Sequence, residues 1–311
     1  MGVVPRFTNR ARADLGSSEI FHLMVVSLVA RTAPQLALLR PLVATRATVA
    51  PTASLVGAAT SVLAPLAALP TTVRDPLSSV VLVIASVAWI KVCNLLSGSG
   101  LTSQYLSRKL VHMGSGPLFL LCWPIFSQTP SGQVCAALVP VLSIIRLLRA
   151  GSRKDGGQAD LVQAVSRSGD KKEALGGPMV YTIVLLLSTL FGWRSLVSAV
   201  AVCQMAIGDG MADVIGRRYG QTRWPKFLEK TGKKSLEGSA AFAFFAFLSS
   251  LGFVGLFGAT GLTTLTPAVV APSLLLISLL AALVEVLPFG DDNFSVPLAA
   301  AALSAALLPR V

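Results

Sequence analysis

Apolar runs separated by short polar segments fill the chain from about residue 77 to its end. Most of them approach the ~20 consecutive apolar residues that a helix needs to cross a bilayer. They lie at about 77–97, 113–127, 132–149, 178–192, 195–215, 238–258, 267–288 and 294–309. Since some runs are short or interrupted by proline, the pattern predicts an all-α, polytopic membrane bundle of about seven or eight transmembrane helices.

Composition agrees with this class. The 311 residues are 53% hydrophobic and only 13% charged, and the mean hydropathy is +0.72. The net charge of +12 comes largely from basic residues between apolar runs. Aromatic residues are few and no nucleic-acid-binding motif appears, so we expect no nucleic-acid partner. The four cysteines all lie in apolar runs without metal-ligand spacing, which indicates buried free thiols.

Residues 1–70 differ from the rest of the chain. They hold six arginines but only two acidic residues, Asp14 and Glu19, among many alanines, serines, threonines and valines. This pattern is typical of an organelle transit peptide. We therefore predict a largely disordered plastid or mitochondrial presequence, with a secretory signal as the alternative, followed by a membrane domain at 77–311.

The connections between runs are asymmetric in charge. Counted alternately, four of them share one side: 98–112, 150–177, 216–237 and 289–293. These carry most of the loop cations, whereas the alternate connections offer only Arg194. By the positive-inside rule, the basic side faces the cytosol, matrix or stroma. Nearly every candidate polar group is thus expected at one membrane face.

Two carboxylates, Asp209 and Asp213, stand at the end of the run 195–215. On a helix they are four residues apart and share a face. Carboxylates in that position suit Mg²⁺ shared with the phosphates of a nucleotide, although a plain interfacial cap is the alternative. Ala212, Gly216 and Gly220 continue the same stripe. They would let phosphates approach the backbone closely, or they would serve helix packing.

A basic segment follows and ends in Lys233, Lys234 and Ser235, a cluster suited to phosphate charge. It is not a P-loop, because that motif needs a glycine at the position of Phe227. His112 is a candidate base or phosphate contact, with an interfacial side chain as the alternative. Secondary candidates are Glu285, which lies inside an apolar run and needs a partner there, and the residues Glu173, Asp291, Asp292 and Asn293 in connections of the basic side.

The combined pattern resembles a known signature. Asp209-x-x-Ala212-x-x-x-Gly216-x-x-x-Gly220, followed by Lys233-Lys234-Ser235-x-Glu237-Gly238, is similar to the CTP-dependent polyprenol kinase family, which includes dolichol kinase and the plant phytol and farnesol kinases. Further matches are Arg108-Lys109-x-x-His112, Glu173-x-x-x-Gly177-Pro178, and Glu285 with Asp291-Asp292-Asn293. The resemblance covers residues from about 80 to the C-terminus and is strongest to the plastid phytol kinases.

The resemblance implies an activity and roles for residues. It implies transfer of the γ-phosphoryl group of CTP to phytol in a chloroplast membrane, giving phytyl phosphate for tocopherol synthesis. Asp209 and Asp213 would hold Mg²⁺, and either His112 or Glu237 would orient or deprotonate the alcohol. The nucleotide would be bound by Arg108, Lys109, Ala212, Gly216, Gly220, Lys233, Lys234, Ser235 and Gly238.

The expected partners follow from the membrane setting. The isoprenoid alcohol would come from the lipid and CTP from the aqueous, basic side. Three alternatives remain open: a farnesol or geranylgeraniol kinase, a cytidylyltransferase that releases pyrophosphate, and a transporter with Lys91, Asp209 and Glu285 along its path. The transporter is disfavoured because the polar residues gather at one face and no inverted repeat is seen.

Overall fold

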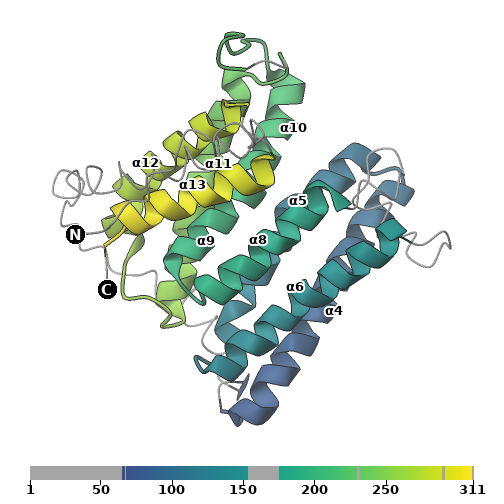
Figure 1. Ribbon diagram of the computed structural model, residues 1–311, viewed down its shortest axis with the longest axis vertical. Helices are drawn as coiled ribbons and strands as arrows, with labels where there is room; N and C mark the ends of the chain where they lie inside the picture. Colours follow the sequence, from purple (N-terminus) through teal and green to yellow (C-terminus); the bar gives the residue numbers. More distant parts are fainter. Residues whose placement is uncertain (1–64, 67, 153–174, 230–231, 289–290, 310–311) are drawn as a thin grey trace, which may run out of the picture.

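The computed structural model describes residues 65–66, 68–152, 175–229, 232–288 and 291–309. Within these ranges the chain is helical apart from its connections, and it forms no strand (Figure 1). The elements are α4 (Thr71–Gly98), α5 (Gln104–Leu121), η1 (Trp123–Ile125), α6 (Pro130–Ser152), α8 (Gly177–Phe191), α9 (Leu196–Cys203), η3 (Gln204–Gly208), α10 (Asp209–Tyr219), α11 (Leu236–Ala259), α12 (Pro267–Val286) and α13 (Asp292–Leu307). Since α9, η3 and α10 form one continuous rod, the eight predicted runs correspond to eight rods of the described chain.

Five of these described rods are long and apolar enough to cross a membrane by length and composition. They are α4, α6, α9 to α10, α11 and α12. The helix α8 is also apolar, but at 15 residues it is shorter. The predicted fold class, an all-α polytopic bundle, is confirmed.

The bundle divides along the chain into two halves. The blue and teal helices α4, α5, α6 and α8 pack together, and the green and yellow helices α9 to α13 form the other half (Figure 1). Contacts of α5 with η3 and α9, and of α8 with α9 and α13, join the halves. Three of the four largest fully buried side chains, Trp123, Phe126 and Phe257, belong to one cluster that includes residues of both halves. The core therefore lies where the halves meet.

The helix α5 begins earlier than predicted. Arg108, Lys109 and His112 lie on this helix rather than in the predicted connection 98–112. Their charge lowers the local hydropathy, so the first turns of the helix were not part of the apolar run from which the helix was predicted. Ser103 starts the helix, since its side chain accepts a hydrogen bond from the Leu106 amide. As a result, three predicted site residues are held on a regular element.

A π-helical turn, η3, interrupts the rod that carries the two aspartates. Such a turn adds a residue to the helix and often marks a functional site. Gln204 at its start is fully buried, and its amide nitrogen donates to the hydroxyls of Ser250 (3.3 Å) and Ser278 (2.9 Å). At Gly208, a Cβ would come within 2.8 Å of the Phe242 ring, so glycine permits this packing. The turn thus anchors the rod just before Asp209.

Candidate active site

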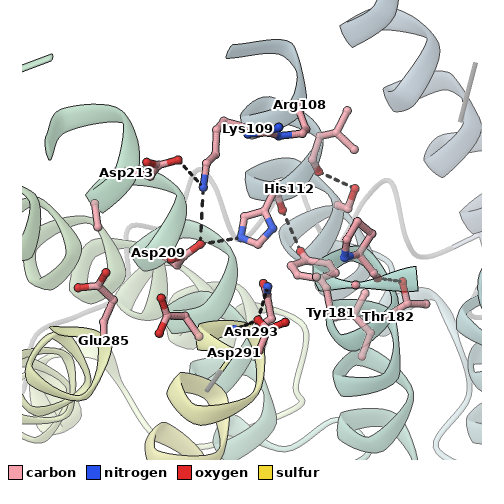
Figure 2. Close-up of a pocket in the computed structure, with 18 of the residues that line it drawn as sticks. Arg108, Lys109, His112, Tyr181, Thr182, Asp209, Asp213, Glu285, Asp291 and Asn293 are labelled. Atoms are coloured by element: carbon pink, nitrogen blue, oxygen red, sulfur yellow. Dashed lines mark hydrogen bonds and ion pairs between the residues drawn. The ribbon is translucent and has the colours of Figure 1, made fainter. Parts of the chain in front are cut away.

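One cavity of about 970 Å³ collects most of the predicted residues. Helices α5, α10, α12 and α13, together with the loop before α11, contribute most of its charged lining (Figure 2). The predicted residues that line it are Arg108, Lys109, His112, Asp209, Ala212, Asp213, Gly216, Lys233, Lys234, Ser235, Gly238, Glu285, Asp291, Asp292 and Asn293. Segments distant in sequence therefore meet at a single site.

Lys109 lies between the two aspartates of α10 (Figure 2). Its Nζ is 2.8 Å from Asp213 Oδ2 and 3.8 Å from Asp209 Oδ2. The other oxygen of Asp213 accepts a 2.6 Å hydrogen bond from Arg217 Nε, one helical turn away. Both oxygens of Asp213 are therefore engaged by cations.

Asp209 instead groups with two carboxylates from the other end of the chain. One oxygen each from Asp209, Glu285 and Asp292 lie within 4.8 Å of one another. Lys234 Nζ is 3.1 Å from Glu285 Oε1 and 3.0 Å from Asp292 Oδ2, and it also donates to the Glu285 carbonyl oxygen. With Lys109 3.8 Å from Asp209, two ammonium groups face three carboxylates, and Lys109 is shared with Asp213, so negative charge remains in excess. An all-oxygen set of this kind fits a hard divalent cation such as Mg²⁺.

The pKa values of Asp292 and Lys234 reflect both burial and the charges around them. Burial raises the pKa of Asp292 to about 6, and the charge of Asp209 adds to this rise while Lys234 opposes it. Burial lowers the pKa of Lys234, but the charges of Glu285 and Asp292 outweigh it, so that the pKa is raised overall. The trio therefore favours a bound positive charge.

The imidazole of His112 has a defined orientation. Its Nε2 is 3.2 Å from the Met205 carbonyl oxygen and 3.3 Å from Asp209 Oδ2. Since both partners are acceptors, Nε2 carries the hydrogen, which leaves the lone pair of the neutral ring on Nδ1. Tyr181 packs against the ring, with centroids 4.8 Å apart, and its hydroxyl donates to the His112 carbonyl oxygen. An imidazole held in this way can accept a proton.

A second hollow of about 740 Å³ adjoins the first and shares Arg108, Asp213, Arg217 and Lys233 with it. Tyr105 lies in its wall, with the guanidinium groups of Arg217 and Arg108 at 4.8 and 5.8 Å from its ring centroid. Such cation–π contacts hold the guanidinium groups in place. With Arg223 also in the wall, cations outnumber the single carboxylate, so the hollow complements an anion.

The small residues of α10 bring two helices together. A Cβ on Gly238 would lie 2.9 Å from the Ala212 carbonyl oxygen and 3.2 Å from the Gly216 Cα. Gly220 does not line the main cavity, and it packs against Ser235. The Ser235 hydroxyl is buried and accepts a hydrogen bond from the Gly238 amide, which starts α11. This packing holds Lys234, the residue before the cap, beside α10.

Two of the predicted residues that the structure describes, Gly220 and Glu237, line neither cavity. The carboxylate of Glu237 accepts hydrogen bonds from the Thr222 amide at 3.0 and 3.3 Å, and Glu237 lines neither hollow. Glu173 lies outside the described residues. Of the two sequence candidates for a base, His112 is therefore the one that faces the cavity.

Sequence reasoning missed several contributors to the site, among them Tyr105, Tyr181, Arg217 and Gln204. Tyr181 sits in an apolar run, and nothing local distinguishes it from a core aromatic. The pairing of Arg217 was detectable, because it follows Asp213 by four residues. Gln204 was detectable as well, since a lone amide in an apolar run needs a partner.

Comparison with known proteins shows that the chain is similar to kinases of several plants. It is 38% identical over 221 residues to the Glycine max protein named "Probable phytol kinase 1, chloroplastic", covering 70% of this chain and 72% of that protein. It is 36% identical over 208 residues to the Arabidopsis thaliana farnesol kinase, covering 65% of each chain. It is 34% identical over 208 residues to phytol kinase 1 of Arabidopsis thaliana, covering 66% of this chain and 67% of that one. No family model and no solved structure matches. The chain belongs to the polyprenol kinase family of the plant phytol and farnesol kinases.

Proposed function

We propose that this protein is a lipid-alcohol kinase of the chloroplast membrane that transfers the γ-phosphoryl group of CTP to phytol, giving phytyl phosphate and CDP. The product would serve phytol salvage for tocopherol synthesis. The observation that carries the proposal is the meeting, in a member of this family, of an acidic trio, two lysines and an oriented histidine at one cavity. Residues 1–70 would act as the plastid transit peptide and residues 77–311 as the kinase domain.

Asp209, Glu285 and Asp292 would hold Mg²⁺. Bound there, the cation would neutralise phosphate charge, as phosphoryl transfer requires. The sequence paired Asp209 with Asp213 for this role. The contacts of Asp213 support a different one, because Lys109 and Arg217 engage both of its oxygens. We assign Asp213 to the orientation of these two cations.

The polyphosphate of the nucleotide would lie in the adjoining basic hollow. Arg108, Arg217 and Lys233 line both this hollow and the main cavity, so a chain of phosphates could extend from one to the other. Guanidinium groups bind phosphate oxygens through paired donors. The choice of CTP as donor rests on the family signature.

The reaction balances with the groups at hand. The alcohol oxygen forms a bond to the γ-phosphorus while the bond from that phosphorus to the β–γ bridging oxygen breaks, and CDP leaves with the electron pair. The hydroxyl proton passes to Nδ1 of His112. Asp209 accepts from Nε2 of the same ring and would stabilise the imidazolium that forms.

A second candidate is farnesol kinase, because one relative carries that name. Purified membranes given CTP or ATP labelled in the γ-phosphate, with phytol, farnesol or geranylgeraniol and with or without chelator, would test both. We expect labelled phytyl phosphate from CTP and none with chelator. Release of pyrophosphate would indicate a cytidylyltransferase, and the absence of any phosphorylated alcohol would refute the proposal.

A further inference from the structure

Helix geometry divides the lining of the main cavity into levels of depth. On α5, Lys109 at the polar end and Phe119 are ten residues apart, which is about 15 Å along the helix axis. On α6, Arg146 and Val139 are about 10 Å apart in the same way. Leu185 joins Phe119 and Val139 from α8. The cavity thus has a charged end and an apolar end.

The apolar end is closed. Phe119, Val139 and Leu185 are 4%, 6% and 7% exposed and belong to one buried cluster. In the same cluster, Leu82 and Trp123 are fully buried. Phe119, Val139 and Leu185 therefore form the floor of the cavity, which ends within the bundle.

Small hydroxyl residues line the space between the two ends: Ser86 on α4, Ser115 on α5, Ser143 on α6 and Thr182 on α8. Each hydroxyl donates to the carbonyl four residues earlier in its own helix, at 2.8, 2.7, 2.9 and 2.8 Å respectively. Because these protons already have acceptors, an apolar ligand leaves none of them unpaired. Their small side chains also leave room that larger apolar residues would fill.

We propose that the part of the cavity between α4, α5, α6 and α8 is a slot for the isoprenoid chain of the alcohol. The hydroxyl end would lie at His112 and the tail would run toward Phe119, Val139 and Leu185. Because His112 and Phe119 are seven residues apart, about 10 Å along α5, a C20 chain would fold within the slot, and its floor would limit the chain length accepted. This inference rests on the proposed kinase function, and it names where the substrate binds. The whole cavity, at about 970 Å³, is at the upper end of the ~300–1,000 Å³ typical of small-molecule sites.

Substitutions within the slot test this directly. Ser143→Leu would fill it one helical turn above the floor, and Phe119→Ala would deepen it. The measurement is kcat/KM for phytol, geraniol, farnesol and geranylgeraniol in detergent. A methylene group more or less in an apolar pocket changes specificity by roughly tenfold or more. We therefore expect Ser143→Leu to lower the geranylgeraniol-to-geraniol ratio at least about tenfold, and Phe119→Ala to raise the geranylgeraniol-to-farnesol ratio.

The matched control is Leu142→Phe, which adds bulk at a side chain that is 50% exposed and does not line the cavity. Its ratios should equal those of the wild type. Because Phe119→Ala empties a buried position, thermal melting is measured for each variant. If Phe119→Ala unfolds, the result for Ser143→Leu alone decides the test. Unchanged ratios in a folded Ser143→Leu protein overturn the slot while leaving the kinase function intact. If the wild type phosphorylates none of the alcohols, the kinase function itself is wrong.

Discussion

Two polar clusters lie toward opposite ends of α4, and their charges have different partners. Near the start of α4, Asp75 is fully buried. Its carboxylate accepts from the amide of Ser127 at 2.8 Å, from the hydroxyl of Ser127 at 2.7 Å, and from the hydroxyl of Ser131. Each of these donors lies in the segment between η1 and the first turn of α6. This first cluster joins one helix to the next connection.

Two arginines complete the first cluster through backbone carbonyls. Arg74 donates to the carbonyl oxygens of Ile125 (2.8 Å) and Phe126 (3.0 Å), and Arg194 donates to that of Phe126 (2.6 Å). Burial, with the nearby charge of Arg74, lowers the pKa of Arg194 to about 10. Arg194 was the one cation that the sequence placed on the side opposite the basic loops. These groups have a structural role, since local backbone uses their hydrogen bonds.

In the second cluster, the candidate active site, charges face other charges across a cavity. Lys109 and Lys234 come from segments remote from the carboxylates that they pair with, and the three carboxylates of the acidic trio outnumber these two lysines. A buried charge is therefore informative about function only together with its partners. Charges satisfied by neighbouring backbone stabilise a fold, and charges assembled around a cavity can act on a ligand.

The strongest test of this contrast is Asp209→Asn. The variant removes one charge from the trio and weakens the acceptor for His112 Nε2, so we expect phosphoryl transfer to fall about a thousandfold. Membrane insertion and thermal melting should stay as in the wild type. Normal activity in this variant would remove Asp209 from the site.

A smaller effect is expected at Asp292. Asp292→Asn removes one of three carboxylate ligands, so the Mg²⁺ concentration at half-maximal activity should rise about ten- to a hundredfold. Chelator-treated membranes titrated with Mg²⁺ provide the measurement. An unchanged Mg²⁺ requirement argues that the trio does not hold the cation.

A substitution in the first cluster should lower stability and leave substrate binding unchanged. Asp75→Asn weakens three hydrogen bonds to a buried carboxylate, and we expect the free energy of unfolding to fall by about 3 kcal/mol. Melting in detergent measures this loss. The KM values of the folded fraction should not change, and an altered KM for CTP or alcohol contradicts a purely structural role.

The smallest effect is predicted for Glu237→Gln. The carboxylate accepts from the Thr222 amide outside both cavities, and a glutamine oxygen can accept the same hydrogen bond. Because the side chain lines neither cavity and keeps its hydrogen bond, activity should stay within about twofold. A large loss of kcat would instead favour Glu237 as the base.

Local patterns in the sequence predicted the helices and one membrane face for the polar groups, because hydropathy reports burial in lipid directly. They also placed Asp209 and Asp213 on one helical face, since spacing along a helix is a local property. They did not show that Asp209 would group with Glu285 and Asp292, which depends on how α10, α12 and α13 pack. The stacking of Tyr181 on His112 depends likewise on the fit between α5 and α8.

The π-turn η3 determines the direction about the helix axis in which the side chains of α10 point. One residue turns an α-helix by about 100° around its axis. Deleting a residue of η3 would leave a segment of nearly the same length and hydrophobicity, which the bilayer would accept equally well. Asp209 and Asp213 would nevertheless be rotated about the helix axis, away from Lys109 and His112. Insertion of this helix into lipid and alignment of its aspartates with the other site residues are thus separate requirements. Deletion of a single residue can leave insertion intact and still abolish the alignment.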